Sequence, residues 1–210
     1  KTTTCVNLAA SLAATKRRVL VVDLDPQGHA TMGLGIDKNA VEHSVYDVLV
    51  DPSCMDQAII SIESVGLDLV PANVELTGAE VELIEFERRE YRLRDALEGC
   101  ESTYDHVIID CPPSLGLLTV NGLVAADSVM IPMQCEYYAL EGLTALLQTV
   151  KRICAGLNPD LVVEGIVRTM FDPRNSLTKD VSAQLAEHFA GALYRTVIPR
   201  NVRLAEAPSY

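Results

Sequence analysis

Three aspartates stand at the ends of apolar runs, where their carboxylates could do chemistry. Asp23 and Asp25 follow the run VLVV at residues 19–22, and Asp110 ends the run VIID at residues 107–110. A carboxylate at the mouth of a buried strand can hold a metal-bound water or orient an attacking water. It can equally bond to its own backbone and form a turn. For the pair Asp23 and Asp25, which precedes Pro-Gln-Gly, both interpretations stay open.

The segment DHVIIDCPP around Asp110 has the form of a Walker B element. In such an element an apolar strand places an aspartate near the β- and γ-phosphates of a nucleotide, where it holds Mg²⁺ directly or through water. The two prolines that follow favour a stiff loop. An ordinary turn at the end of a strand is the plainer alternative.

The chain opens with KTTTCVNLAA, so Lys1, Thr2 and Thr3 begin a stretch rich in helix-forming residues. Lysine followed by threonine is also the end of the phosphate-binding pattern GxxxxGK[ST], in which backbone N–H groups and a helix N-terminus surround phosphates. The glycines of that pattern are not in the sequence. Alone, the segment is an ordinary helix start, and its meaning depends on the aspartates.

The three segments complement one another chemically. Lys1 and Thr2 supply a phosphate-binding cation and a hydroxyl ligand for magnesium. Asp25 supplies a carboxylate that can orient water, and Asp110 supplies one for the metal. Together they predict hydrolysis of a magnesium-bound nucleoside triphosphate.

The elements that must position these residues alternate between strand and helix. An α/β fold follows, with a mostly parallel twisted sheet covered by helices on both faces as a three-layer sandwich. Ligands of such sheets lie beyond the carboxyl ends of the strands. The hydrophobic pattern predicts strands at 18–23, 67–70, 107–110, 128–134, 161–170 and 194–199, and helices at 1–15, 74–99 with a break near Glu87, 116–127, 137–157 and 176–190, the last capped by Ser176.

The composition excludes several classes of protein. The 210 residues are 49% hydrophobic, which suits one sizeable core. No apolar run approaches the ~20 residues that cross a bilayer. No two of the six cysteines have CxxC spacing, so we expect buried, reduced thiols in place of a zinc or iron–sulfur site.

The charge is acidic but uneven along the chain. The net charge of −12 argues against a general coat for nucleic acid. Residues 1–164 carry −14, whereas residues 165–210 carry +2. A local cationic surface near the C-terminal end is therefore compatible with the acidic whole.

Five segments, in order, resemble the ParA/Soj chromosome- and plasmid-partition ATPases. They are KTTTCVNLAASLA, VLVVDLDPQGHAT, YDHVIIDCPPSLGLLTVNGLVAAD, PMQCEYYALEGL and TVIPRNVRLAEAPSY, and they span essentially the whole chain. The last one separates ParA/Soj from the rest of the deviant Walker A class, which includes the Min-type ATPases and the nitrogenase iron proteins. The resemblance implies a P-loop NTPase-like fold and the cofactors ATP and Mg²⁺.

The resemblance also implies roles for the residues named above. Lys1 would grip the β/γ-phosphates, Thr2 would bind Mg²⁺, and Thr3 would lie by the α-phosphate. Asp25 would position the attacking water with Asp23 as its support, and Asp110 would reach Mg²⁺ through water.

Towards the C-terminus, the resemblance implies an adenine-binding edge and a DNA-binding surface. Pro199 and Asn201 would border the adenine, and Met170 would lie near it. The DNA-contacting residues would be Arg174 and Arg203, with Arg200 and Lys179 as weaker candidates. Phosphate contacts of this kind make binding independent of sequence and sensitive to salt.

The resemblance implies that the chain is a single ParA-like ATPase domain, residues 1–210, shortened at both ends. We expect its first strand, its glycine-rich loop and a C-terminal helix to be missing. The loop would contain a lysine that reaches the partner's nucleotide across a dimer.

The function implied is an ATP-dependent DNA-segregation ATPase of the bacterial cytoplasm and nucleoid. Its partners would be a second copy in the ATP-bound homodimer, non-specific DNA, and a ParB-type centromere-binding protein that stimulates slow hydrolysis, with no membrane involved. Three alternatives stay open: a Min-like membrane-associated ATPase with an amphipathic helix, an electron-transfer ATPase like the nitrogenase iron protein, and a DNA-binding module without enzymatic activity.

Overall fold

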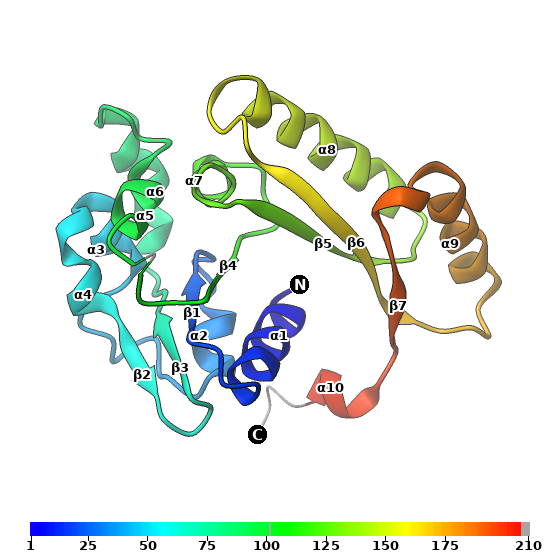
Figure 1. Ribbon diagram of the computed structural model, residues 1–210, viewed down its shortest axis with the longest axis horizontal. Helices are drawn as coiled ribbons and strands as arrows, with labels where there is room; N and C mark the ends of the chain where they lie inside the picture. The colour runs from blue at the N-terminus through cyan, green and yellow to red at the C-terminus, as the bar shows by residue number, and fades with distance from the viewer. Residues whose placement is uncertain (101, 207–210) are drawn as a thin grey trace. The chain divides into compact units, whose positions relative to one another are not determined.

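The computed structural model describes residues 1–100 and 102–206. The chain divides into two compact units, Lys1–Ala126 and Asp127–Tyr210, which are described here one at a time (Figure 1). The expected single domain remains a prediction. The last four residues of the segment TVIPRNVRLAEAPSY lie outside the described residues.

The first unit contains a four-stranded sheet in the order β2-β3-β1-β4. The central strand β1 pairs in parallel with β3 and β4, whereas β2 pairs antiparallel with β3. The unit's elements are α1 (Thr2–Ala14), β1 (Val19–Asp23), α2 (His29–Gly33), α3 (Val45–Val50), η1 (Pro52–Cys54), α4 (Met55–Ala58), β2 (Ile60–Ile62), β3 (Leu67–Val70), α5 (Leu76–Glu82), η2 (Leu83–Glu85), α6 (Arg92–Leu97), β4 (His106–Asp110) and α7 (Leu117–Ala125).

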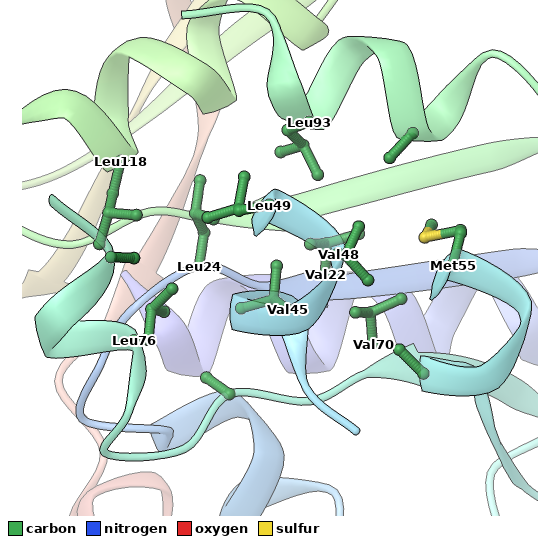
Figure 2. Close-up of a cluster of buried hydrophobic side chains, with 14 of the residues drawn as sticks. Val22, Leu24, Val45, Val48, Leu49, Met55, Val70, Leu76, Leu93 and Leu118 are labelled. Carbon is green, nitrogen blue, oxygen red and sulfur yellow. The ribbon is translucent and has the colours of Figure 1, made fainter. Parts of the chain in front are cut away.

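Strand β1 is buried on both faces, because its side chains alternate between two hydrophobic clusters. Val19 and Val21 face a cluster that includes Ala9 of α1. Leu20 and Val22 face a larger cluster that is built with α3 to α7 (Figure 2). The unbroken VLVV run therefore forms the strand between two helical layers, which confirms the predicted α/β arrangement.

The second unit contains a parallel three-stranded sheet in the order β5-β6-β7. Helices α8 and α9 supply Leu143, Val181 and Leu185 to its core, where they pack against Ile131 and Ile166 of the sheet. The elements are β5 (Ser128–Gln134), α8 (Ala139–Gly156), β6 (Val162–Phe171), α9 (Ser176–His188), η3 (Ala190–Ala192), β7 (Leu193–Pro199) and α10 (Val202–Glu206).

The stretch 74–99 forms α5, η2 and α6 with an interruption at 86–91, in agreement with the predicted break near Glu87, and Arg88 there adopts a positive φ of 55°. Two other local features differ from what the sequence predicted. The short antiparallel strand β2 was not predicted, since only one of its three residues is buried. The cap of α9 is Asn175 and not Ser176: the Asn175 side chain accepts a hydrogen bond from Leu177 N at 3.0 Å, because Asn175 has the extended backbone of a capping residue.

Candidate functional site

The carboxyl ends of β1 and β4 bring the aspartates of the first unit together. The two strands are parallel and in register, with Asp23 opposite Asp110. Leu24 N donates to the Asp110 carbonyl at 2.8 Å, which extends the pairing one residue past β1. Neighbouring parallel strands end at the same sheet edge, so two segments 87 residues apart form one site.

Asp110 is a buried carboxylate to which no residue of the described part of the chain donates a hydrogen bond. Its residue is 2% exposed, and within the described part of the chain neither of its carboxylate oxygens accepts a hydrogen bond. The ammonium of Lys1 lies 3.5 Å from Oδ1. A buried acceptor left without a donor is costly, and carboxylate oxygens are the ligands that Mg²⁺ prefers. Asp110 therefore fits the role of a metal ligand.

Lys1 lies between two carboxylates. Its Nζ is 3.5 Å from Asp110 Oδ1 and 3.8 Å from Asp25 Oδ2, and it also donates to the Cys111 carbonyl. The Lys1 side chain is 38% exposed, whereas those of both aspartates are almost fully buried. A cation at this position can neutralise the aspartates and also face an anionic ligand from solvent.

Asp25 begins a tight turn and keeps one oxygen towards Lys1. Its Oδ1 accepts from Gln27 N at 3.0 Å, and its carbonyl accepts from Gly28 N at 2.8 Å. Gly28 has a φ of +63° at the start of α2, and a Cβ there would lie 3.2 Å from the Ala72 carbonyl. Both features favour glycine at this position. Asp25 can therefore fill both roles that the sequence left open: one oxygen forms the turn, and the other remains available to orient water.

Asp23 is a positioning group, since described donors occupy both of its oxygens. Oδ2 accepts from the backbone N and the hydroxyl of Thr31, each at 2.8 Å, and Oδ1 accepts from Asp25 N at 3.3 Å. Burial raises the pKa of the Asp23 carboxyl, and the Thr31 hydrogen bonds partly oppose that rise. Asp23 therefore orients the backbone of Asp25. A direct role for Asp23 in catalysis stays a prediction.

Thr2 and Thr3 form the first turn of α1, and Lys1 is the residue that precedes the helix. Thr2 is half-buried and Thr3 is exposed. The backbone N–H groups at the start of a helix attract anions, which is compatible with the phosphate-binding role expected for this segment. The specific ligand roles of Thr2 and Thr3 stay predictions.

Within the second unit, the residues expected around adenine gather at the carboxyl ends of β6 and β7. Phe171, next to Met170, is in register with Pro199, and Arg200 N donates to the Phe171 carbonyl at 3.1 Å. Met170 is exposed and has a positive φ of 52°. Asn201 Oδ1 accepts from Arg203 N at 2.9 Å at the start of α10. Adenine binding stays a prediction for all three residues.

The expected DNA-binding residues differ in their partners. Arg174 is 88% exposed, and its guanidinium makes two hydrogen bonds to Asp172, from Nε to Oδ1 at 3.0 Å and from Nη2 to Oδ2 at 2.9 Å. These bonds lower the pKa of Asp172 to about 2. Arg200, Arg203 and Lys179 are exposed. The charge of Arg174 is thus largely offset by its neighbour.

Thr31 is the residue of this site that sequence reasoning missed. It is fully buried, and its hydroxyl donates to Asp23 and accepts from Ala72 N at 2.9 Å. Its position eight residues after Asp23 gives no periodic signal, because the contact depends on the turn at Gly28.

Two further observations concern metals and membranes. Within residues 1–100 and 102–206, no group of three or more His, Cys, Asp or Glu is arranged to hold a metal ion. A metal at Asp110 would need further ligands from a hydroxyl, water or phosphate. No helix in the described part of the chain is long and apolar enough to cross a membrane.

Comparison with known proteins matches this chain to partition proteins. Residues 1–163 match the family model described as AAA domain. The chain is 55% identical over 210 residues to the sporulation initiation inhibitor protein Soj of Bacillus subtilis and 51% identical to the chromosome partitioning protein ParA of Myxococcus xanthus. Both matches include the whole of this chain. They cover 83% of the length of the Soj protein and 74% of the length of the ParA protein.

The fold of this chain is also similar to that of a solved structure. A structure of cobyrinic acid a,c-diamide synthase from Mycobacterium smegmatis, with a bound ATP analogue and magnesium, has a TM-score of 0.89 and 39% identity. The match covers 100% of this chain and 86% of that one. Together with the relatives and the geometry above, this shows that the chain belongs to the ParA/Soj family of partition ATPases, within the AAA-domain proteins.

Proposed function

We propose that this chain is the hydrolytic core of an ATP-driven DNA-segregation switch. The observation that carries the proposal is the position of Lys1 Nζ, 3.8 Å from Asp25 and 3.5 Å from Asp110 at one sheet edge. The relatives named Soj and ParA support the role in partition, and the neighbour crystallised with an ATP analogue and magnesium supports the choice of nucleotide and metal.

Each residue of the site has a role in this proposal. Lys1 binds the β/γ-phosphates, and Asp110 and Thr2 hold Mg²⁺. Mg²⁺, when bound with the nucleotide, neutralises charge on the phosphoryl oxygens. Asp25 accepts a hydrogen bond from the attacking water through Oδ2, because Gln27 N already uses Oδ1. Asp23 holds the backbone of Asp25 in place.

The second unit supplies DNA and base recognition in this proposal. Met170, Pro199 and Asn201 border the adenine. Arg203 and Arg200 contact DNA phosphates, and Arg174 joins them when it leaves Asp172. ATP binding creates a homodimer that binds DNA without sequence preference. A ParB-type partner then stimulates slow hydrolysis and releases the protein from the nucleoid in the bacterial cytoplasm.

The test is phosphate release by the full-length protein with Mg-ATP, alone, with non-specific duplex DNA, and with DNA and a ParB-type partner. We expect slow turnover that rises stepwise in that series, and an ATP-dependent dimer in size-exclusion chromatography. A protein that binds DNA yet releases no phosphate under any condition is a DNA-binding module, and the proposal then fails.

The same preparation tests the remaining alternatives. Sedimentation of the ATP-bound protein with anionic vesicles indicates a Min-like function. Stoichiometric iron in the purified protein indicates an electron-transfer ATPase. ATP turnover that requires cobyrinic acid and ignores DNA indicates the reaction named for the structural neighbour. Each of these results contradicts the partition proposal.

A further inference from the structure

The loop that follows Asp110 is anchored at its far end by a residue from another helix. Glu80 of α5 accepts a hydrogen bond through Oε1 from Leu118 N at 3.4 Å. Leu118 is the second residue of α7, and the capping position before α7 is Gly116, which has no side chain to offer. The Glu80 carboxylate therefore replaces the missing cap, and its negative charge suits a helix N-terminus.

Gly116 leaves the space that the Glu80 carboxylate needs. A Cβ at Gly116 would overlap Glu80 Oε1 and lie 3.0 Å from Glu80 Cδ. The φ of Gly116 is −86°, which any residue adopts. The backbone conformation is open to any residue, so the effect of a Cβ at this position would be to displace the Glu80 carboxylate from its contact with α7.

The loop between Asp110 and α7 is held at both ends. At its start, Leu24 N donates to the Asp110 carbonyl at 2.8 Å. At its end, the Thr119 hydroxyl donates to the Ser114 carbonyl at 2.6 Å, next to the contact with Glu80. Residues 111–116 therefore form a six-residue connection between Asp110 and the start of α7, with contacts at both of its ends.

Helix α5 also connects to the turn that carries Asp25. Glu75 N, one residue before α5, donates to Asn73 Oδ1 at 3.1 Å, and the neighbouring Ala72 N donates to the Thr31 hydroxyl at 2.9 Å. Leu76 of α5 and Leu118 of α7 belong to one buried cluster (Figure 2). The segment that leads into α5 thus contacts the support of Asp25, and Glu80 within α5 contacts the loop that follows Asp110.

We infer that Glu80 is a positioning residue for Asp110: by capping α7 in the space left by Gly116, it sets the loop that presents the Asp110 carboxylate to Mg²⁺. This inference rests on the proposed function for its catalytic consequence. The contact itself is independent of that function.

The experiment compares Glu80→Ala, Glu80→Gln and the control Glu82→Ala in the full-length protein. Glu82 lies on the same helix, but its carboxylate accepts the Tyr46 hydroxyl at 2.6 Å. We expect Glu80→Ala to lower kcat by about 10- to 100-fold and to raise the Mg²⁺ concentration needed for half-maximal binding of a fluorescent ATP analogue. Nucleotide affinity without Mg²⁺ should not change. Glu80→Gln keeps an acceptor and should stay within about threefold of the parent, as should Glu82→Ala.

A double-mutant cycle tests the packing directly. Gly116→Ala should shift the midpoint of urea unfolding and accelerate hydrogen exchange of the amides at 114–118 when Glu80 is present. In the Glu80→Ala background the same change should have little effect, because the clash is gone. Equal effects in both backgrounds overturn the inference, as does parent-like Mg²⁺ dependence in a folded Glu80→Ala protein. If the parent releases no phosphate, the proposed function fails, while the cycle still decides the contact.

Discussion

The Thr31 hydroxyl donates a hydrogen bond to Asp23 Oδ2 at 2.8 Å, and both residues are fully buried. The same hydroxyl accepts from Ala72 N, so one side chain joins the end of β1, the start of α2 and the segment after β3. This relationship makes Asp23 a support for Asp25, although the two aspartates are of the same type and only one residue separates them in the pattern DLD.

Replacing Thr31 tests that support. Thr31→Val keeps the shape but leaves Ala72 N without its acceptor and removes one donor from Asp23. We expect the free energy of unfolding to fall by about 2–4 kcal/mol, since each buried group left unpaired costs about 1–3 kcal/mol. Thr31→Ser keeps the hydroxyl and should lose less than half as much. Urea titration of both variants measures the difference, and equal losses would mean that the methyl group and not the hydroxyl matters.

Removing the Asp25 carboxylate should separate binding from turnover. In Asp25→Ala, ATP binding and dimerisation should persist while phosphate release falls by about 10²- to 10⁴-fold, the range for loss of a general base or a water-positioning group. Single-turnover phosphate release and size-exclusion chromatography provide the two readouts. Unchanged release in the full-length variant would remove Asp25 from its assigned role.

Replacing Asp110 should change how strongly nucleotide binding depends on Mg²⁺. Asp110→Asn has nearly the same shape but is a poorer ligand for a hard cation. We expect a higher Mg²⁺ requirement for nucleotide binding, measured by titrating Mg²⁺ against a fluorescent ATP analogue. Because the ion pair with Lys1 is lost, the variant should also be tested for folding by circular dichroism. A folded variant with the Mg²⁺ dependence of the parent would contradict the metal role.

Charge reversal at Arg203 should abolish DNA binding. Arg203→Glu is expected to lose DNA pelleting and to reduce the salt slope of any remaining binding by about 1, while ATP-dependent dimerisation stays intact. Arg94→Glu, on α6 of the first unit, makes the same charge change as a control. Arg174→Ala should weaken binding less, because Asp172 already offsets that charge. Equal losses for the Arg203 and Arg94 variants would indicate a general charge effect.

The pair Asp172–Arg174 makes a prediction about pH. The pKa of Asp172 is lowered to about 2, mainly by the hydrogen bonds from the Arg174 side chain and backbone. A lowered pKa in the folded state favours the carboxylate. The resulting stabilisation is present above the ordinary value of about 3.9 and is lost as the pH falls through about 2. In Arg174→Ala the NMR titration of Asp172 should move up towards the ordinary value. A midpoint that does not move would contradict the pairing.

Sequence alone determined the strands that carry the site. The runs VLVV and VII, each followed by an aspartate, are apolar without interruption, which predicts a strand at each place. In the structure β1 is buried throughout, whereas the first two residues of β4 are exposed. That local rule predicted β1 and β4 and therefore placed their terminal aspartates at one sheet edge. The longer amphipathic segments were predicted for the same reason, since α8 has enough turns to show its period. Short elements such as β2, with a single buried residue, have no comparable pattern.

Tertiary structure alone decided what each site residue does. Asp23 and Asp25 are alike in sequence, but the fold brings Thr31 to Asp23 and Lys1 towards Asp25. In the sequence, nothing distinguishes Glu80 from other glutamates of a helix. Only the fold shows that its carboxylate lies against Gly116. Hydrogen bonds and close approaches depend on positions set by distant segments. The spacing of hydrophobic residues along the sequence, in contrast, indicates only which face of a helix or strand is buried.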